Sequence, residues 1–382
     1  MRVLLISHAL VTRSNHRLPE ELARFSDIDL HVFAPEWWNE ESRSVQQEKT
    51  FDPRYAIRLG KTAYFRQPMP NLFLFRTGLA QAIRELQPDI LDVHEEPFSL
   101  AMGQILLLRR AFAPQARLMF YSWQNIVKRY PPPFSLFEQW AFREASYATV
   151  PVSEVGDVLR RKGYRGPLAI NPPGVDEHIF MPMPAARMET RAALGVAPDA
   201  TLLGYLGRLA PEKGIQDIVA ALPLLPSTTR LLIVGGGDRT AVERQAHALG
   251  VADRLMFTGA VNRLETPRFL NALDMLVVPS HTTPRWKEQF GRVIAEAAMC
   301  GLPVIGSSSG AIPEVVGPTG LVFPEGNVPA LTNAVRLLIA QPDMARKLGE
   351  QARMRALEQF TWARVAAERH ALYTTVCQTT AR

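Results

Sequence analysis

Short apolar runs alternate with helix-length segments along most of the chain, and this rhythm limits the fold more than any other feature. The runs are rich in Val, Ile and Leu, as in V-L-L-I-S at residues 3–7 and L-L-I-V-G at residues 231–235. Strands that are apolar on both sides are typical of a parallel sheet covered by helices on both faces. The sequence therefore predicts an α/β protein built from Rossmann-like, doubly wound sheets.

A segment rich in Pro and Gly interrupts the rhythm near the middle of the chain. Residues 169–184 read A-I-N-P-P-G-V-D-E-H-I-F-M-P-M-P, and their five Pro or Gly residues exclude a helix and indicate a linker. We therefore expect residues 1–170 to form one domain, residues 171–360 to form a second, and residues 361–382 to form a helix that crosses back to the first. The two sheets are expected to face each other across a cleft.

The first domain contains one irregular stretch. Residues 37–70 carry charge and Pro, so we expect them to form an excursion at the edge of the sheet. Helices are expected over residues 19–25 before this stretch and over residues 73–86 after it.

Cysteine usage and the first residues limit the environment of the protein. Cys300 and Cys377 are the two cysteines, and no C-x-x-C or His cluster occurs, so we expect neither a disulfide framework nor a metal site. The opening M-R-V-L-L-I-S-H has too few apolar residues for a signal peptide or a membrane span. A cytoplasmic protein is expected, with no nucleic-acid partner.

Two acids eight residues apart surround the expected start of a helix in the second domain. In W-K-E-Q-F-G-R-V-I-A-E, Glu288 precedes Gly291, and Glu296 lies on the helix that follows. The N–H groups of a first helical turn favour an anion such as phosphate. A ligand with a phosphate and hydroxyls fits this position, and an equally simple alternative is that both acids are solvated surface charge.

A basic loop follows the first strand of the second domain. G-R-L-A-P-E-K-G at residues 207–214 supplies Arg208 and Lys213 from one tight turn, at a strand end where open α/β sheets bind ligands. The planar guanidinium and the compact ammonium suit a diphosphate, although a solvated basic turn is the alternative. Gly235 and Gly236 after the next strand permit close backbone approach.

Polar side chains also follow two strands of the first domain. His94 ends D-I-L-D-V-H, and Trp123 and Gln124 end L-M-F-Y-S-W-Q. Side chains at such positions project toward a ligand site, but a lone His is as often structural, and the other two could simply cap a loop.

Together these motifs resemble those of the retaining glycosyltransferases of the GT-B fold in group 4 (GT4). The family's E-x7-E pair is similar to Glu288 and Glu296, its G-R-x-x-x-x-K-G to residues 207–214, and its N-G-V-D linker to N-P-P-G-V-D. Its G-G-x-P-E loop is similar to four further residues: Gly310, Ala311, Pro313 and Glu314.

The resemblance implies transfer of a sugar from a UDP-, GDP- or ADP-linked donor to a sugar or lipid-linked acceptor, without a metal or other cofactor. It implies that Glu288, Arg208, Lys213 and His94 act in catalysis. The remaining residues implied to bind substrate are Glu296, Gln289, Phe290, Gly291, Arg292, Gly207, Gly235, Gly236, Val261, Trp123 and Gln124.

Two departures from the family pattern concern the first domain. The family's Gly-Gly loop after the first strand is replaced by S-H-A-L-V-T-R-S-N-H, and its T-x-H strand end by Ser122, Trp123 and Gln124. Because an amide cannot act as an acid or a base near neutral pH, Gln124 cannot take the role of a His.

The net charge of +6 is concentrated in one region. Residues 109–165 hold ten Arg or Lys against four acids and are interleaved with aromatic residues. We therefore expect peripheral contact with the inner face of an anionic membrane, with a scattered basic surface over core aromatics as the alternative.

Three other classes of protein compete with a glycosyltransferase. A sugar-nucleotide epimerase or phosphorylase would share the diphosphate site. A nicotinamide dehydrogenase is disfavoured because neither first-strand loop contains G-x-G-x-x-G. A non-catalytic sugar-nucleotide-binding protein is disfavoured by the presence of both acids and both cations.

Overall fold

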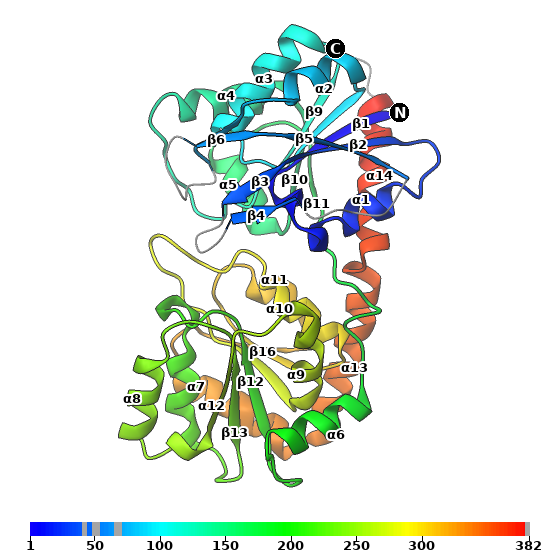
Figure 1. Cartoon of the computed structure of the whole chain (residues 1–382). Coiled ribbons are helices and arrows are strands. Elements are labelled where there is room, and N and C mark those ends of the chain that lie inside the picture. The colour runs from blue at the N-terminus through cyan, green and yellow to red at the C-terminus, as the bar shows by residue number, and fades with distance from the viewer. Residues whose placement is uncertain (40–43, 48–53, 65–70, 379–382) are drawn as a thin grey trace. The chain divides into compact units, whose positions relative to one another are not determined.

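The computed structural model describes residues 1–39, 44–47, 54–64 and 71–378, and the chain forms two compact units. The first unit is Met1–Gly174 with the segment from Trp362 onward, and the second is Val175–Thr361. Each unit holds its own parallel sheet with helices on both faces, so the predicted α/β class of two Rossmann-like units is confirmed (Figure 1).

The sheet of the first unit has seven strands in the order β11-β10-β9-β8-β1-β2-β5, and every pairing in it is parallel. Its strands are β1 (Arg2–Ile6), β2 (Asp29–Pro35), β5 (Ala56–Gly60), β8 (Ile90–Val93), β9 (Arg117–Tyr121), β10 (Ala145–Val150) and β11 (Leu168–Ile170).

Helices cover both faces of this sheet. They are η1 (His8–Val11), η2 (Arg13–Asn15), α1 (Arg17–Leu22), α2 (Leu79–Leu86), α3 (Leu100–Phe112), α4 (Phe134–Glu144), α5 (Ser153–Arg161) and α14 (Trp362–Gln378). The last helix returns to this unit and packs against α1, and its Val365, Tyr373 and Val376 join the same buried cluster as Val3 and Leu5 of β1. Burial of this apolar face, rather than helix propensity, holds α14 in place.

The irregular stretch differs from the expectation in two places. Residues 56–60 do not leave the sheet but form its edge strand, β5, beside β2. Residues 73–75 form a strand, β7 (Phe73–Phe75), because alternate aromatic side chains are buried there; the helix begins only after Gly78. Short hairpins pair β3 (Trp37–Asn39) with β4 (Ser44–Gln46) and β6 (Thr62–Tyr64) with β7. Other parts of the expected excursion, residues 40–43, 48–53 and 65–70, lie outside the described residues.

The sheet of the second unit has six parallel strands in the order β14-β13-β12-β15-β16-β17. Its strands are β12 (Leu202–Leu206), β13 (Arg230–Val234), β14 (Leu255–Gly259), β15 (Met275–Val278), β16 (Val304–Ser307) and β17 (Leu321–Phe323). The strands are apolar and almost wholly buried in the middle of the sheet, as the continuous Val, Ile and Leu runs predict.

The helices of the second unit lie in two groups, one on each face (Figure 1). They are α6 (Pro184–Ala193), η3 (Pro211–Lys213), α7 (Ile215–Ala221), η4 (Leu222–Leu224), α8 (Thr240–Ala248), η5 (Ala252–Arg254), η6 (Arg263–Glu265), α9 (Thr266–Ala272), α10 (Arg292–Met299), α11 (Ile312–Val316), η7 (Gly317–Thr319), α12 (Val328–Ala340) and α13 (Pro342–Gln359).

Each sheet contains one point where the direction of winding reverses. In the first unit the chain builds outward from β1 to β2 on one side and from β8 to β9 on the other, so β1 and β8 flank the reversal. In the second unit β12 and β15 flank it. Loops that follow such strands part to either side, and the crevice between them is where open α/β sheets bind ligands.

Candidate active site

The basic loop and the first acid meet at the reversal point of the second sheet. Lys213, at the end of the loop that follows β12, places Nζ 2.8 Å from Oε2 of Glu288, which follows β15. The Ser280 hydroxyl lies 3.4 Å from the same oxygen, and the ammonium lies 4.4 Å from the centroid of the Trp286 ring. Two residues that are 75 positions apart in the sequence therefore form one partly buried ion pair at a strand-end crevice.

Close backbone contacts hold these loops together. Gly207 donates its N–H to the Val234 carbonyl at 2.9 Å, and Leu209 donates to the Gly236 carbonyl at 2.9 Å. A Cβ at Gly235 would lie 1.8 Å from the Gly207 carbonyl oxygen, so only Gly permits this approach. The Gly residues of both strand ends thus bring the loops after β12 and β13 side by side.

Glu288 is a loop residue and Glu296 a helical one, as predicted. Helix α10 begins after its N-cap residue Gly291. The Glu288 carbonyl accepts a hydrogen bond from the backbone N–H of Ala311 at 3.0 Å, and a Cβ at Gly310 would lie 2.2 Å from the same oxygen. The loop before α11 therefore fixes the backbone that carries the acid.

Glu296 lies on the buried side of α10 and has a cationic partner. Its Oε1 is 3.1 Å from a guanidinium nitrogen of Arg263, which lies in η6 two residues after Val261. Burial raises the pKa of Glu296, while the charges of Arg263 and Arg292 act in the opposite direction. Sequence reasoning missed Arg263, because its only signal is a charge in a loop 33 residues from its partner.

Three other predicted residues present side chains to solvent. Arg208, Gln289 and Arg292 are exposed, so their side chains are accessible to a ligand. The side chain of Phe290, in contrast, is buried edge-on against Phe360, with ring centroids 5.7 Å apart, so this residue can offer a ligand only its backbone.

Within the described part of the chain, no group of three or more His, Cys, Asp or Glu side chains is arranged to hold a metal ion. The cations at the site are instead supplied by Lys and Arg side chains, which suit an anionic ligand.

The structure places His94 in a buried polar cluster of the first unit. Its Nε2 contacts a guanidinium nitrogen of Arg369 on α14 and lies 3.4 Å from Oδ2 of Asp92. Its ring stacks on Tyr121 at 5.2 Å. Burial lowers the pKa of His94, and the Arg369 charge adds to this against the opposing effect of Asp92. Because Nε2 of His94 accepts a hydrogen bond from Arg369, this contact favours a structural role for His94 over a catalytic role.

Trp123 and Gln124 belong to a second cluster that contains an acid the sequence analysis missed. The Glu96 carboxylate accepts from the Ser122 hydroxyl and the Trp123 N–H, each at 2.7 Å. Burial raises the pKa of Glu96 to about 7, although these hydrogen bonds and Lys162 oppose the shift. Gln124 bridges the Tyr130 hydroxyl at 2.7 Å and Lys162 Nζ at 2.9 Å, so it organises the loop rather than standing free.

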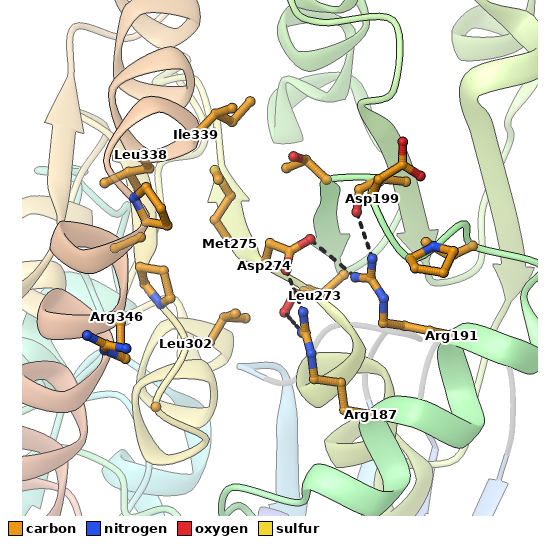
Figure 2. Close-up of a pocket in the computed structure, with 18 of the residues that line it drawn as sticks. Arg187, Arg191, Asp199, Leu273, Asp274, Met275, Leu302, Leu338, Ile339 and Arg346 are labelled. Atoms are coloured by element: carbon orange, nitrogen blue, oxygen red, sulfur yellow. Dashed lines mark hydrogen bonds and ion pairs between the residues drawn. The ribbon is translucent and has the colours of Figure 1, made fainter.

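A cavity of about 950 Å³ lies at the opposite end of the second sheet, beside the starts of β12 and β15. Figure 2 shows Arg187 and Arg191 directed at Asp274. The same guanidinium groups donate to the carbonyls of Leu273 and Ala200. Because these donors are engaged, they attach α6 to the sheet rather than form an anion site.

No helix in the described ranges combines the length and apolar character needed to cross a membrane.

Comparison with known proteins gives matches on both units. The family model described as "Glycosyltransferase Family 4" matches residues 11–178, and the one described as "Glycosyl transferases group 1" matches residues 186–355.

Two curated relatives illustrate the similarity. The GDP-mannose-dependent alpha-(1-6)-phosphatidylinositol monomannoside mannosyltransferase of Mycolicibacterium smegmatis is 36% identical over 199 residues, covering 50% of this chain and 52% of that protein. The 2-deoxystreptamine N-acetyl-D-glucosaminyltransferase of Streptomyces fradiae is 29% identical over 344 residues, covering 78% and 80%. The chain spans about half the length of the first of these relatives.

Among solved structures, the sucrose-phosphate synthase of Thermosynechococcus elongatus aligns with a TM-score of 0.75 at 23% identity, over 98% of this chain and 99% of that one. The chain therefore has the GT-B fold, with one Rossmann-like sheet in each unit.

Proposed function

The chain belongs to the GT-B glycosyltransferases of family 4, and on that premise we propose that it transfers a sugar from a nucleotide-diphosphate sugar to an acceptor hydroxyl, with retention of configuration and without a metal. The observation that carries the proposal is the Lys213–Glu288 pair at the reversal point of the second sheet. It combines a cation for a departing diphosphate with a carboxylate for sugar hydroxyls.

In this proposal the donor binds to the second unit. Arg208 and Lys213 neutralise the diphosphate, and Glu288 with the N–H groups of Phe290 and Gly291 holds the donor sugar. Glu296 binds the ribose hydroxyls, while Val261, Gly235 and Gly236 border the nucleotide. The Lys213 ammonium exchanges part of its contact with Glu288 for phosphate when the donor arrives, which leaves the carboxylate available to the sugar.

The acceptor belongs to the first unit in this proposal. The two relatives are named for acceptors of different kinds, a phosphatidylinositol monomannoside and 2-deoxystreptamine. A sugar or lipid-linked hydroxyl compound is therefore the acceptor class we propose. An epimerase or phosphorylase is not favoured, because both family models and both relatives are transferases.

The experiment that tests the proposal is direct detection of transfer. The full chain is incubated with GDP-mannose, UDP-glucose, UDP-N-acetylglucosamine or ADP-glucose, and with 2-deoxystreptamine or phosphatidylinositol vesicles in the presence and absence of EDTA. The expected result is a glycosylated product from one donor with the α-linkage of that donor preserved and no loss with EDTA. Failure of every combination, or an inverted linkage, would count against it.

Substitution of Glu288 and of Glu296 is expected to change different kinetic constants of the transfer reaction. Glu296→Gln should raise the donor KM, because ribose contacts hold in the ground state and the transition state alike. Glu288→Gln should lower kcat by roughly 10- to 100-fold, in line with about 1.5–3 kcal/mol for a hydrogen bond to a charged group, and should retain nucleotide binding.

Calorimetric titration with the nucleoside diphosphate, paired with steady-state kinetics, measures both effects. Glu358→Gln, an exposed Glu on α13, is the matched control and should behave as wild type. If Glu288→Gln abolishes nucleotide binding and Glu296→Gln does not, the two roles are reversed.

Membrane contact rests on a narrower surface than the sequence indicated. Tyr130 of the basic region stacks on the buried Phe98 at 3.9 Å, and Phe142 packs near the buried Phe120, so these two aromatic rings are partly buried against the core. One segment of the region presents apolar and cationic side chains together, namely Val127, Lys128, Arg129 and Leu136, while Arg110, Phe112, Arg143, Arg161 and Arg165 are exposed elsewhere in it. We propose that this segment touches anionic lipid.

Reversing the charge of Lys128 and Arg129 together to Glu is expected to reduce flotation of the protein with anionic vesicles at low salt. Each cation near such a surface contributes about 1 kcal/mol. Reversal of Lys61 and Arg76, which are also exposed in the first unit, is the control and should leave flotation unchanged. If the wild-type protein does not float with anionic vesicles at low salt, the proposed membrane contact is wrong.

A further inference from the structure

The loop after the first strand carries a His that faces an acid across the reversal point of the first sheet. His8 follows β1 and Glu95 follows β8, the two strands between which the winding reverses. The second unit has the same arrangement, with Lys213 after β12 and Glu288 after β15. Each sheet thus holds a pair of a nitrogen base and a carboxylate where ligand crevices form.

The contacts of Glu95 fix the position of His8. The Glu95 side chain is only 2% exposed, and both of its oxygens lie 2.8 Å from Nδ1 of His8. Oε1 also accepts from the backbone N–H of His8 at 2.7 Å. Among the described residues, this buried carboxylate has its hydrogen bonds with His8, so its role is to orient that residue.

Aromatic side chains restrain the His8 ring further. The ring packs against Trp38 with centroids 4.3 Å apart and the ring planes tilted by 30°, and it meets Phe73 edge-on at 5.8 Å. Trp38 and Phe73 are themselves buried, so they act as a rigid support. The ring is therefore held at one nitrogen, one face and one edge, which is the preorganisation that a binding group requires.

The remaining nitrogen of His8 is available to a ligand. A carboxylate at Nδ1 places the proton of the neutral ring there, which makes Nε2 a hydrogen-bond acceptor. The His8 side chain is 26% exposed, and no side chain or backbone group of the described residues bonds to Nε2. A fixed acceptor at a strand-end crevice suits a hydroxyl donor.

We propose that His8 Nε2 accepts a hydrogen bond from a hydroxyl of the acceptor substrate, with Glu95 as the positioning residue. The proposal rests on the proposed function, because it names the group of the first unit that recognises the acceptor. His8 binds and orients in this role, and no covalent bond forms or breaks at its ring.

Two substitutions of His8 separate the two ring nitrogens. In His8→Asn the amide NH₂ can still donate to Glu95 while the Nε2 acceptor is lost, whereas in His8→Gln the longer side chain can restore an acceptor near the Nε2 position. Glu95→Gln keeps the size of the side chain but can donate to Nδ1, which moves the ring proton to Nε2 and removes the acceptor. His178→Asn, at an exposed His of the second unit, is the matched control.

The experiment measures transfer to 2-deoxystreptamine and to phosphatidylinositol vesicles, with nucleoside diphosphate binding measured beside it. We expect His8→Asn and Glu95→Gln to raise the acceptor KM at least tenfold, with the donor KM and the nucleotide Kd within twofold of wild type. We expect His8→Gln to recover part of the loss and His178→Asn to change nothing.

An acceptor KM that stays at the wild-type value in both His8→Asn and Glu95→Gln overturns the inference, even if the melting temperature falls, because a purely structural pair would alter stability alone. Equal increases in donor and acceptor KM also overturn it. If the wild-type chain binds nucleotide but glycosylates neither probe, the proposed function fails at its own test and the inference falls with it.

Discussion

Lys213→Ala should lower the turnover of sugar transfer by about 100- to 1,000-fold, the effect of about 2.7–4 kcal/mol that follows from removing one preorganised group at a site of developing charge. Negative charge grows on the diphosphate as the sugar departs, and Lys213 is held at the crevice by Glu288 and Trp286 before any donor binds. A cation fixed in advance does not have to reorganise during the reaction. Arg208→Ala should act in the same direction.

The measurement is kcat with a saturating donor, paired with thermal unfolding of each variant. Lys347→Ala, which removes an exposed Lys from α13, is the control and should leave both quantities unchanged. The melting temperature should change much less than kcat, because Lys213 and Glu288 lie at the end of the sheet near the surface rather than in the core. Turnover near the wild-type rate in Lys213→Ala and Arg208→Ala would make the basic loop a solvated turn.

The sequence was a good guide to those parts of the fold and site that depend on local pattern. Continuous apolar runs predicted the central strands of both sheets, because a strand buried on both faces has no polar positions, whereas the edge strand β5 was missed. Lys213 and Glu288 could be assigned to one site, because each follows a strand of the same parallel sheet and such ends share an edge. The helix predicted to start near Gly291 also forms.

Pairings between distant segments could not be predicted in this way. Arg263 reaches Glu296 across 33 residues, and His8 reaches Glu95 across 87. His94 was identified for its place at a strand end, but its partner Arg369 lies 275 residues further along the chain. The hydrogen-bond partner of each polar side chain depends on tertiary packing. This packing cannot be predicted from a single sequence.

The contact of Arg369 with Asp92 provides the second large expected effect, on stability. Both side chains are fully buried, with Nε of Arg369 3.1 Å from Oδ2 of Asp92. Arg369 also donates to the Thr149 hydroxyl at 2.6 Å, and the Tyr373 hydroxyl donates to the same Asp92 oxygen at 2.5 Å. Helix α14 is thereby joined to strands β8 and β10 of the first unit.

Arg369→Met should destabilise the first unit by about 3–5 kcal/mol, because removing one partner of a buried pair leaves the other charge uncompensated. Urea denaturation followed by Trp fluorescence measures this, since five of the six Trp residues belong to the first unit: Trp37, Trp38, Trp123, Trp140 and Trp362. Arg364→Met, an exposed Arg on the same helix, is the control. The double variant Arg369→Met with Asp92→Asn should recover much of the loss, because it removes the unpaired charge as well.

The effect of Arg369→Met should shrink as the pH falls. Burial acts to raise the pKa of Asp92, but the charges of Arg369 and His94 outweigh it and lower the pKa to about 2. A carboxyl whose pKa is depressed on folding stabilises the native state above its unfolded pKa of about 3.9, and this contribution is lost as the pH falls toward 2. Without Arg369, burial dominates and the pKa of Asp92 should rise, so the variant regains stability on protonation while the wild type loses it. A free-energy difference between the two proteins that is equal at pH 7 and pH 3.5 would show that the charge of Asp92 does not cause the loss, and would leave the lost packing of the Arg369 side chain as its source.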